Sequence, residues 1–132
     1  MSITINLELT DHCNIRCKMC SQSMRSDAHG VPKKFMSWDI WRRSLQNLRG
    51  YPEAIHLCPH WLGEPTMHPH FDQFIEYAFA VNKNNTLFEK FKLHTNAVQF
   101  SRERGRLLLM LSRLPFLKAN TFNFVHFSVD AF

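Results

Sequence analysis

The segment TDHCNIRCKMC, residues 10–20, places Cys13, Cys17 and Cys20 in one short loop with the spacing Cys-x3-Cys-x2-Cys. Thiolates are soft ligands that suit zinc, copper(I) or iron–sulfur clusters. A structural zinc site is normally closed by four protein ligands, whereas each iron of a cubane cluster is usually held by one thiolate. Three thiolates in one loop would leave one iron of a cubane without a protein ligand and free to bind a small molecule.

The residues around this segment alternate between strand and helix patterns. Ile3, Ile5, Leu7 and Leu9 are separated by polar residues, and this period of two predicts a strand over 3–10. Further strands are predicted at about 54–61, 88–96 and 122–130, and residues 21–34 are predicted to be irregular.

Three helices are predicted between these strands. Ser37 caps the first, which carries the apolar stripe Trp38, Trp41, Leu45 and Leu48 and stops at Gly50 and Pro52. The second has Pro69 in its first turn and breaks at the polar residues 82–85, and the third runs from the Ser101 cap through Leu114 to Pro115.

Strands that alternate with helices build a parallel sheet with right-handed crossovers. Each predicted strand has one polar and one apolar face, for example His56, Cys58 and His60 against Ile55, Leu57 and Trp61. A solvent-facing antiparallel sheet would give the same alternation, but the intervening helices favour a curved parallel sheet whose polar face lines a lumen. The predicted fold class is therefore α/β, a partial (βα) TIM-like barrel with parallel strands and outer helices.

Composition narrows the class of protein. The formal net charge of +5 comes from scattered basic residues, so a solvated basic surface is favoured over a nucleic-acid interface. The aliphatic run Leu107–Leu111 is far too short to span a bilayer, and the N-terminus shows no secretory signal. We therefore expect a cytoplasmic protein whose thiols stay reduced, with no membrane partner.

Four segments in order resemble the radical S-adenosylmethionine (SAM) enzymes. Residues 13–20 resemble the cluster loop of that family, Gly63-Glu64-Pro65 its Gly-Gly-Glu-Pro segment, Thr95-Asn96-Ala97 its Thr-Asn-Gly and Ser128-Val129-Asp130-Ala131 the end of its fourth strand. Each segment follows the carboxyl end of a predicted strand, where active sites of α/β barrels assemble. The resemblance implies that residues 1–132 are a radical SAM core domain truncated after the fourth strand, with about four of six βα units.

The resemblance also implies the chemistry. Cys13, Cys17 and Cys20 would ligate a [4Fe–4S] cluster whose fourth iron is chelated by SAM. Reductive cleavage of SAM would then give a 5′-deoxyadenosyl radical that abstracts hydrogen from the substrate. The candidate substrates are a small molecule, such as a cofactor precursor, and a peptide. An electron donor such as flavodoxin or ferredoxin is an implied partner.

Six residues are carried over as SAM contacts. Met19 would lie near the adenine, Gly63 and Glu64 would meet the amino group, and Asn96, Ser128 and Asp130 would meet the ribose hydroxyls or the carboxylate. Simple loop packing, a surface turn and strand-end capping are the respective structural alternatives. Leu62 stands where the family has its first glycine, so the backbone geometry at this segment departs from the family.

The competing hypothesis is a non-enzymatic zinc-binding module with a basic, nucleic-acid-contacting surface. His12 or a distant histidine would supply the fourth zinc ligand.

Cys58 is interpreted as a small buried apolar residue, and His56, His60, His94 and His126 share the predicted lumen-facing parity. Since the later strands of the family barrel are not in this chain, we expect it to bind SAM poorly on its own.

Overall fold

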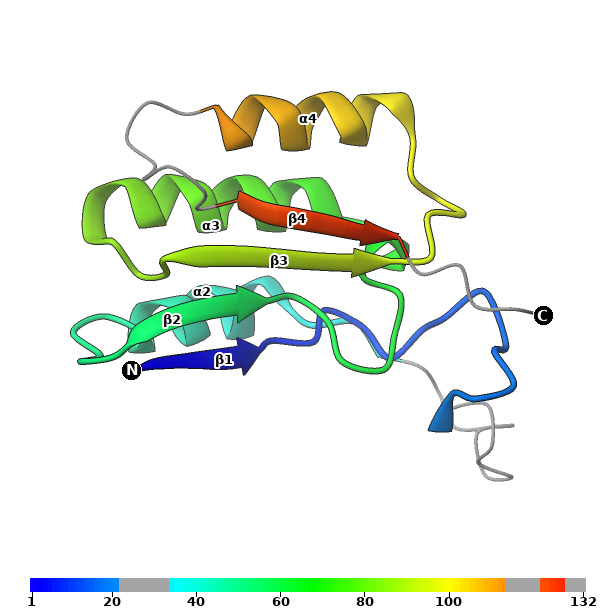
Figure 1. Ribbon diagram of the computed structural model, residues 1–132, viewed down its shortest axis with the longest axis horizontal. Helices are drawn as coiled ribbons and strands as arrows, with labels where there is room; N and C mark the ends of the chain where they lie inside the picture. The colour runs from blue at the N-terminus through cyan, green and yellow to red at the C-terminus, as the bar shows by residue number, and fades with distance from the viewer. Residues whose placement is uncertain (22–33, 114–121, 128–132) are drawn as a thin grey trace.

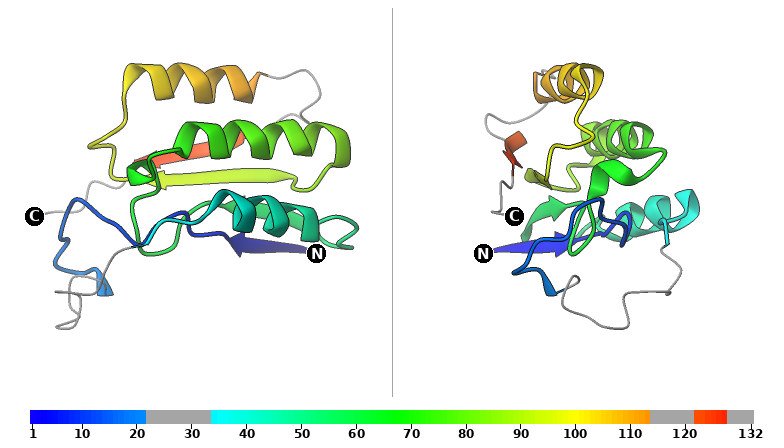
Figure 2. Two further views of the ribbon diagram at one scale, coloured as in Figure 1. Left: turned by 180° about the vertical axis from the view of Figure 1, so that it is seen from behind. Right: turned by 90° about the vertical axis from the view of Figure 1, so that its right-hand side faces the viewer.

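The computed structural model describes residues 1–21 and 34–113, together with the backbone of the strand at 122–127. Four parallel strands form one sheet in chain order: β1 (Ser2–Asn6), β2 (Ala54–Cys58), β3 (Lys90–Thr95) and β4 (Phe122–Phe127) (Figure 1). Helices α2 (Trp38–Asn47), α3 (Phe71–Asn85) and α4 (Arg102–Ser112) follow β1, β2 and β3 in turn and lie on one side of the sheet (Figure 2). The predicted parallel α/β arrangement is confirmed, and the described strands form an open sheet.

The first three strands are shorter than predicted. β1 ends at Asn6, although Leu7 N still donates to Cys58 O at 2.9 Å and Leu9 N to Pro59 O at 3.4 Å. The second strand ends at Cys58, so Trp61 lies beyond it and is 64% exposed instead of facing the core. The predicted alternation holds within the strands, because Ile55, Leu57, Phe91 and Leu93 are buried and their neighbours His56 and Lys92 are not.

Both serine caps are confirmed. The hydroxyl of Ser37 accepts from Ile40 N at 3.3 Å, and that of Ser101 accepts from Arg104 N at 3.2 Å. The stripe of α2 is correct for Trp41 and Leu45, which are fully buried, whereas Trp38 is 43% exposed.

The second helix differs from the prediction at both ends. It begins at Phe71, so Pro69 precedes the helix instead of occupying its first turn. It continues through Asn85, because Asn82 is buried and its Oδ1 accepts from Phe88 N at 2.9 Å. The helix ends at Thr86, whose backbone is left-handed. Leu114 and Pro115, the predicted end of the third helix, lie outside the described residues.

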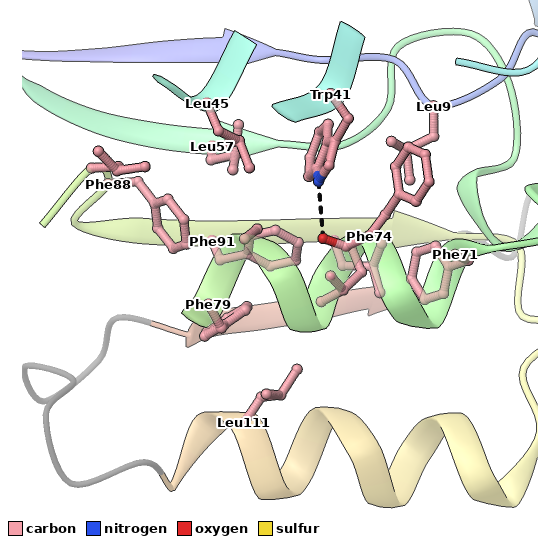
Figure 3. Packing of buried hydrophobic residues seen from close by; sticks show 14 of the residues in the cluster. Leu9, Trp41, Leu45, Leu57, Phe71, Phe74, Phe79, Phe88, Phe91 and Leu111 are labelled. Atoms are coloured by element: carbon pink, nitrogen blue, oxygen red, sulfur yellow. Dashed lines mark hydrogen bonds between the residues drawn. The ribbon is translucent and has the colours of Figure 1, made fainter. Parts of the chain in front are cut away.

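The hydrophobic core lies between the sheet and the helices. It contains Leu9, Trp41, Leu45, Leu57, Phe71, Phe74, Phe79, Phe88, Phe91 and Leu111 (Figure 3). Trp41 Nε1 donates to Phe74 O at 3.0 Å, which satisfies the polar atom of this buried ring and ties α2 to α3. With its apolar face covered in this way, the sheet leaves its polar face and its carboxyl ends for the site.

Candidate functional site

Three of the four motif segments meet at one pocket beyond the carboxyl ends of β2 and β3. Its volume is about 230 Å³. The lining residues are Cys13, Ile15, Cys17, Met19, Cys20, His60, Trp61, Leu62, Gly63, Glu64, His94, Thr95 and Asn96. Segments up to 83 residues apart in sequence are thus brought together, as the contact between Cys13 and Asn96 shows. Of the predicted site residues, Ser128 and Asp130 lie outside the described residues.

The cysteine loop is fastened where it leaves and rejoins the fold. Thr10 pairs with Phe35 in an antiparallel bridge, and Thr10 Oγ1 donates to Lys34 O at 2.8 Å. Lys34 N donates to Asp11 Oδ1 at 2.7 Å, and Met36 N donates to Leu9 O at 2.8 Å. These bonds fix residues 9–11 against residues 34–36, so the chain segments before and after the loop lie side by side.

Stacked rings reinforce this closure. The ring of His12 stacks on Phe35 with centroids 4.5 Å apart, and His68 meets Phe35 edge-on at 5.5 Å. His68 Nδ1 accepts from His70 N at 3.1 Å, so the hydrogen is on Nε2, which donates to Met36 O at 3.0 Å. Burial lowers the pKa of His68, which agrees with a neutral ring held by both nitrogens.

The part of the loop that carries the thiols, residues 13–20, contains no helix or strand. Cys20 N donates to Cys17 O at 3.0 Å around a turn at residues 18–19. The three cysteines are half-buried, and among the described residues they form no disulfide. Asn96 Nδ2 donates to Asn14 Oδ1 at 2.7 Å and lies 3.8 Å from Cys13 Sγ, which joins the loop to the end of β3.

The chemistry of these donors fits an iron–sulfur cluster, since three thiols of one loop line a single pocket. Within residues 1–21 and 34–113, however, no three His, Cys, Asp or Glu side chains are gathered so that they could hold a metal ion. The thiols therefore have to draw together for a cluster to bind, as happens where metal binding is coupled to ordering of the ligands.

Gly63 is required by the close approach of two chain segments. A Cβ atom at this position would lie 1.8 Å from Thr10 O and 2.9 Å from His12 O. Glu64 N donates to His12 O at 2.6 Å, so the Gly63-Glu64 backbone lies directly against the start of the cysteine loop. The carboxylate of Glu8 accepts from Leu62 N at 2.6 Å and Gly63 N at 2.8 Å.

The Glu64 side chain is a buried centre of hydrogen bonding, and only 3% of the residue is exposed. Its Oε1 accepts from Thr66 N at 3.1 Å, from Thr66 Oγ1 at 2.6 Å and from Thr95 Oγ1 at 2.6 Å. Its Oε2 accepts from Asn96 N at 2.6 Å. A carboxylate has about four acceptor sites, two on each oxygen, so Oε2 retains capacity for a further donor.

Glu8, Thr66 and Thr95 were not predicted as site residues. Glu8 could have been found from its position on the polar parity, near the end of the first predicted strand. A carboxylate at this edge of the sheet would be expected to have a hydrogen-bond partner. Thr95 was noted only as part of the Thr95-Asn96-Ala97 segment, because its partner Glu64 is 31 residues away in the sequence. Thr66 is two residues from Glu64 but gave no signal, because a threonine beyond a strand end is common.

Two histidines lie next to each other at the strand side of the pocket. The rings of His60 and His94 stack with centroids 4.8 Å apart and planes 21° from parallel. Burial, and then the neighbouring His94, lower the pKa of His60 to about 4, while burial raises the pKa of the Cys58 thiol. Cys58 Sγ lies 3.1 Å from His60 Nδ1, so the thiol and the imidazole are joined by a hydrogen bond.

Two large apolar side chains stand at the rim of the pocket. Met19 is 74% exposed and Trp61 is 64% exposed, and both line the pocket. Met19 was predicted to lie near the adenine of SAM, and that role stays a prediction. Trp61 was missed as a site residue because it was assigned to the apolar face of the second strand.

No family model matches the chain. A tungsten-containing aldehyde ferredoxin oxidoreductase cofactor-modifying protein of Pyrococcus furiosus is 31% identical over 87 residues, which cover 61% of this chain and 23% of that protein. An S-adenosylmethionine-dependent nucleotide dehydratase of Selenomonas ruminantium is 30% identical over 81 residues, which cover 60% of this chain and 26% of that protein. The chain thus spans about a quarter of the length of these curated relatives.

Two crystal structures of BtrN share the fold. BtrN in complex with AdoMet and 2-DOIA matches with a TM-score of 0.67 at 19% identity, over 84% of this chain and 42% of BtrN. BtrN in an open conformation matches with a TM-score of 0.65 at 19% identity, over 84% of this chain and 46% of BtrN. Together with the curated relatives, this shared fold confirms the resemblance to radical SAM enzymes that the motifs predicted. Among the described residues, no helix is both long and apolar enough to cross a membrane.

Proposed function

We propose that this chain is the N-terminal part of a radical SAM catalytic domain, in which Cys13, Cys17 and Cys20 hold a [4Fe–4S] cluster. The observation that carries the proposal is that the three thiols and Glu64 line one pocket at the carboxyl ends of parallel strands. The four strands would be the first part of a partial barrel, as the shared fold with BtrN supports. When bound, the cluster supplies the electron that cleaves SAM reductively.

The residues of the chain would bind and orient the cofactor. Oε2 of Glu64 has the remaining capacity to accept a hydrogen bond from the SAM ammonium group, and burial strengthens a charge-assisted bond of this kind. Asn96 would hold the Cys13 side of the loop against β3. Met19 and Trp61 at the rim would cover the adenine or the substrate, and Ser128 and Asp130 remain proposed SAM contacts.

The whole activity is proposed from the relatives. BtrN binds AdoMet and 2-DOIA, and one curated relative is an S-adenosylmethionine-dependent nucleotide dehydratase, so a small-molecule substrate is favoured over a peptide. The electron would come from a donor such as flavodoxin or ferredoxin. We propose the cytoplasm, a reducing compartment, as the site of action, because a cluster held by Cys13, Cys17 and Cys20 needs reduced thiols as ligands.

Anaerobic reconstitution of the full chain with iron and sulfide tests the proposal. We expect about four iron and four sulfide per chain and a brown protein with broad visible absorption. Cys17→Ala should lose the cluster, because a cubane held by two thiolates is no longer anchored. Cys58→Ala is the matched control and should keep it, since Cys58 is not among the residues that line the pocket.

Two outcomes of this reconstitution would contradict the proposal. Uptake of one tightly bound zinc per chain, with no incorporation of iron and sulfide, would support the zinc-binding module instead. Equal iron incorporation by wild type and Cys17→Ala would show that the iron is bound elsewhere in the chain.

A further inference from the structure

The face of the sheet that carries no helix is basic. Lys90 and Lys92 of β3 and His56 of β2 lie on this face, and all three are half-buried. β2 and β3 are the two inner strands of the sheet, and the helices lie on the other side (Figure 2). Inner strands of a parallel sheet are normally apolar on both faces, so ammonium groups here show that this face is not a core.

The basic residues form a continuous path to the pocket. His56 is in register with Lys90. Burial, and then the charges of Lys92 and Lys90, lower the pKa of His56. Burial raises the pKa of the Cys58 thiol against the opposing charge of Lys92, so the ammonium groups lie near these side chains. Cys58 contacts His60, which stacks on His94 in the pocket lining.

Among residues 1–21 and 34–113, neither Lys90 nor Lys92 forms an ion pair with an aspartate or glutamate. Glu64 is buried with four donors, and Glu8 accepts from the Leu62 and Gly63 amides. Glu89 is also near this face, and its charge only partly opposes the lowering of the His56 pKa by burial and by the two lysines.

We propose that this basic face, defined as Lys90, Lys92, His56, His60 and His94, binds the phosphate or carboxylate group of a small-molecule substrate. The ammonium groups would give charge-assisted hydrogen bonds to the oxyanion. The two stacked imidazoles would contact the part of the substrate that extends toward the cysteine pocket. Charge complementarity selects this occupant, and its identification as the substrate rests on the function proposed above.

Binding of pyrophosphate and of citrate to the full chain, before any iron is added, tests this inference. Pyrophosphate represents a phosphate-bearing substrate, and citrate represents a carboxylate-bearing one. The anion that binds more tightly therefore identifies the anionic group of the substrate. Titration followed by calorimetry or NMR should show saturable binding to the wild type that weakens as salt is added. The double variant Lys90→Gln, Lys92→Gln should bind about a hundredfold more weakly, at about tenfold for each lost contact.

Lys83→Gln is the matched control. Lys83 is an exposed lysine in the last turn of α3, so the variant loses the same kind of charge away from the basic face and should bind as the wild type does. The single variant Lys92→Gln should bind about tenfold more weakly, whereas Lys92→Arg, which keeps the charge, should bind within about threefold of the wild type. This pair tests the inference even if the double variant does not fold. No saturable binding of either anion to the folded wild type, or an equal loss in Lys83→Gln, would overturn the inference.

Failure of this inference is distinguishable from failure of the proposed function. Anion binding is measured without iron or SAM, whereas the proposed function is judged by incorporation of iron and sulfide. A chain that assembles the cluster but binds neither anion refutes the basic face as a substrate site alone. A chain that binds an anion but takes up no iron refutes only the radical SAM proposal.

Discussion

Glu64 and the three cysteines line the same pocket, but their surroundings hold them in different ways. The strand-end network, defined as Glu8, Gly63, Glu64, Thr95 and Asn96, is joined by hydrogen bonds between residues far apart in sequence. The cysteine loop, residues 13–20, has no helix or strand and is fastened at its base and through Asn96. One wall of the pocket is therefore built by the fold, and the other depends on what it binds.

The strand-end network is therefore suited to positioning a ligand, and the cysteine loop is suited to assembling a cluster. A carboxylate with four donors cannot move without breaking several bonds, so the group proposed to meet SAM is fixed before any ligand arrives. Thiolates that are not yet gathered can close around a cluster, and the binding free energy then orders the loop. Four predictions test the strand-end side of the pocket and its junction with the cysteine loop.

The largest effect is expected at the junction. In Gly63→Ala the new Cβ atom would overlap Thr10 O, which is backbone and cannot rotate away. We expect a loss of roughly 3 kcal/mol or more in the free energy of unfolding, measured by urea denaturation. Gly105→Ala is the control, because its Cβ atom would meet Phe100 Cε1 at 3.5 Å within a helix, and it should gain about 0.5–1 kcal/mol. Equal stability of both variants would mean that the two walls are not in close contact.

Glu64→Gln tests the built wall itself. The amide nitrogen of glutamine cannot accept a hydrogen bond, so a donor among Thr66, Thr95 and Asn96 would lose its partner in a buried site. We expect a loss of about 2–3 kcal/mol in thermal or urea unfolding. Glu76→Gln, on the exposed side of α3, should change stability by less than about 0.5 kcal/mol. A loss as small as that in Glu64→Gln would show that the network does not hold this wall.

The pH dependence of stability reports on His60. Since its folded pKa of about 4 lies below the unfolded value of 6.5, the unfolded chain takes up this proton first as the pH falls. This contribution to stability is complete above pH 6.5 and is lost progressively between pH 6.5 and about 4, by about 2 kcal/mol at pH 4.5. His60→Asn should flatten that slope in urea unfolding series, and His70→Asn, an exposed histidine, should retain it. An unchanged slope in His60→Asn would contradict a neutral, buried ring.

The smallest effect is expected at Ala97, which follows Asn96. Its φ of 62° is in the left-handed region, where a Cβ atom is strained and the related family motif has glycine. Ala97→Gly should therefore raise the free energy of unfolding by about 0.5–1 kcal/mol, after the entropy gained by the unfolded chain is subtracted. Ala80→Gly on the exposed side of α3 should lower it by about 1 kcal/mol. A loss in both variants would mean that Ala97 is not strained.

The sequence signals that succeeded were local ones. The cysteine spacing, the alternation in the strands and the Ser37 and Ser101 caps each depend on residues within a few positions of one another. The contacts that build the strand-end network join residues 31 to 55 positions apart, such as Thr95 with Glu64 and Gly63 with Glu8, and no single-sequence pattern announces them. For the same reason the end of α3 was misplaced, because it depends on the bond between Asn82 and Phe88.

Amide hydrogen exchange of the full chain before and after anaerobic reconstitution tests the difference between the two walls directly. The amides of Glu64, bonded to His12 O, and of Asn96, bonded to Glu64 Oε2, should be protected in both states. Amides of residues 13–20 should exchange rapidly before iron and sulfide are added and slowly afterwards. Loop amides that are equally protected in both states, or Glu64 and Asn96 amides that become protected only with the cluster, would contradict the account.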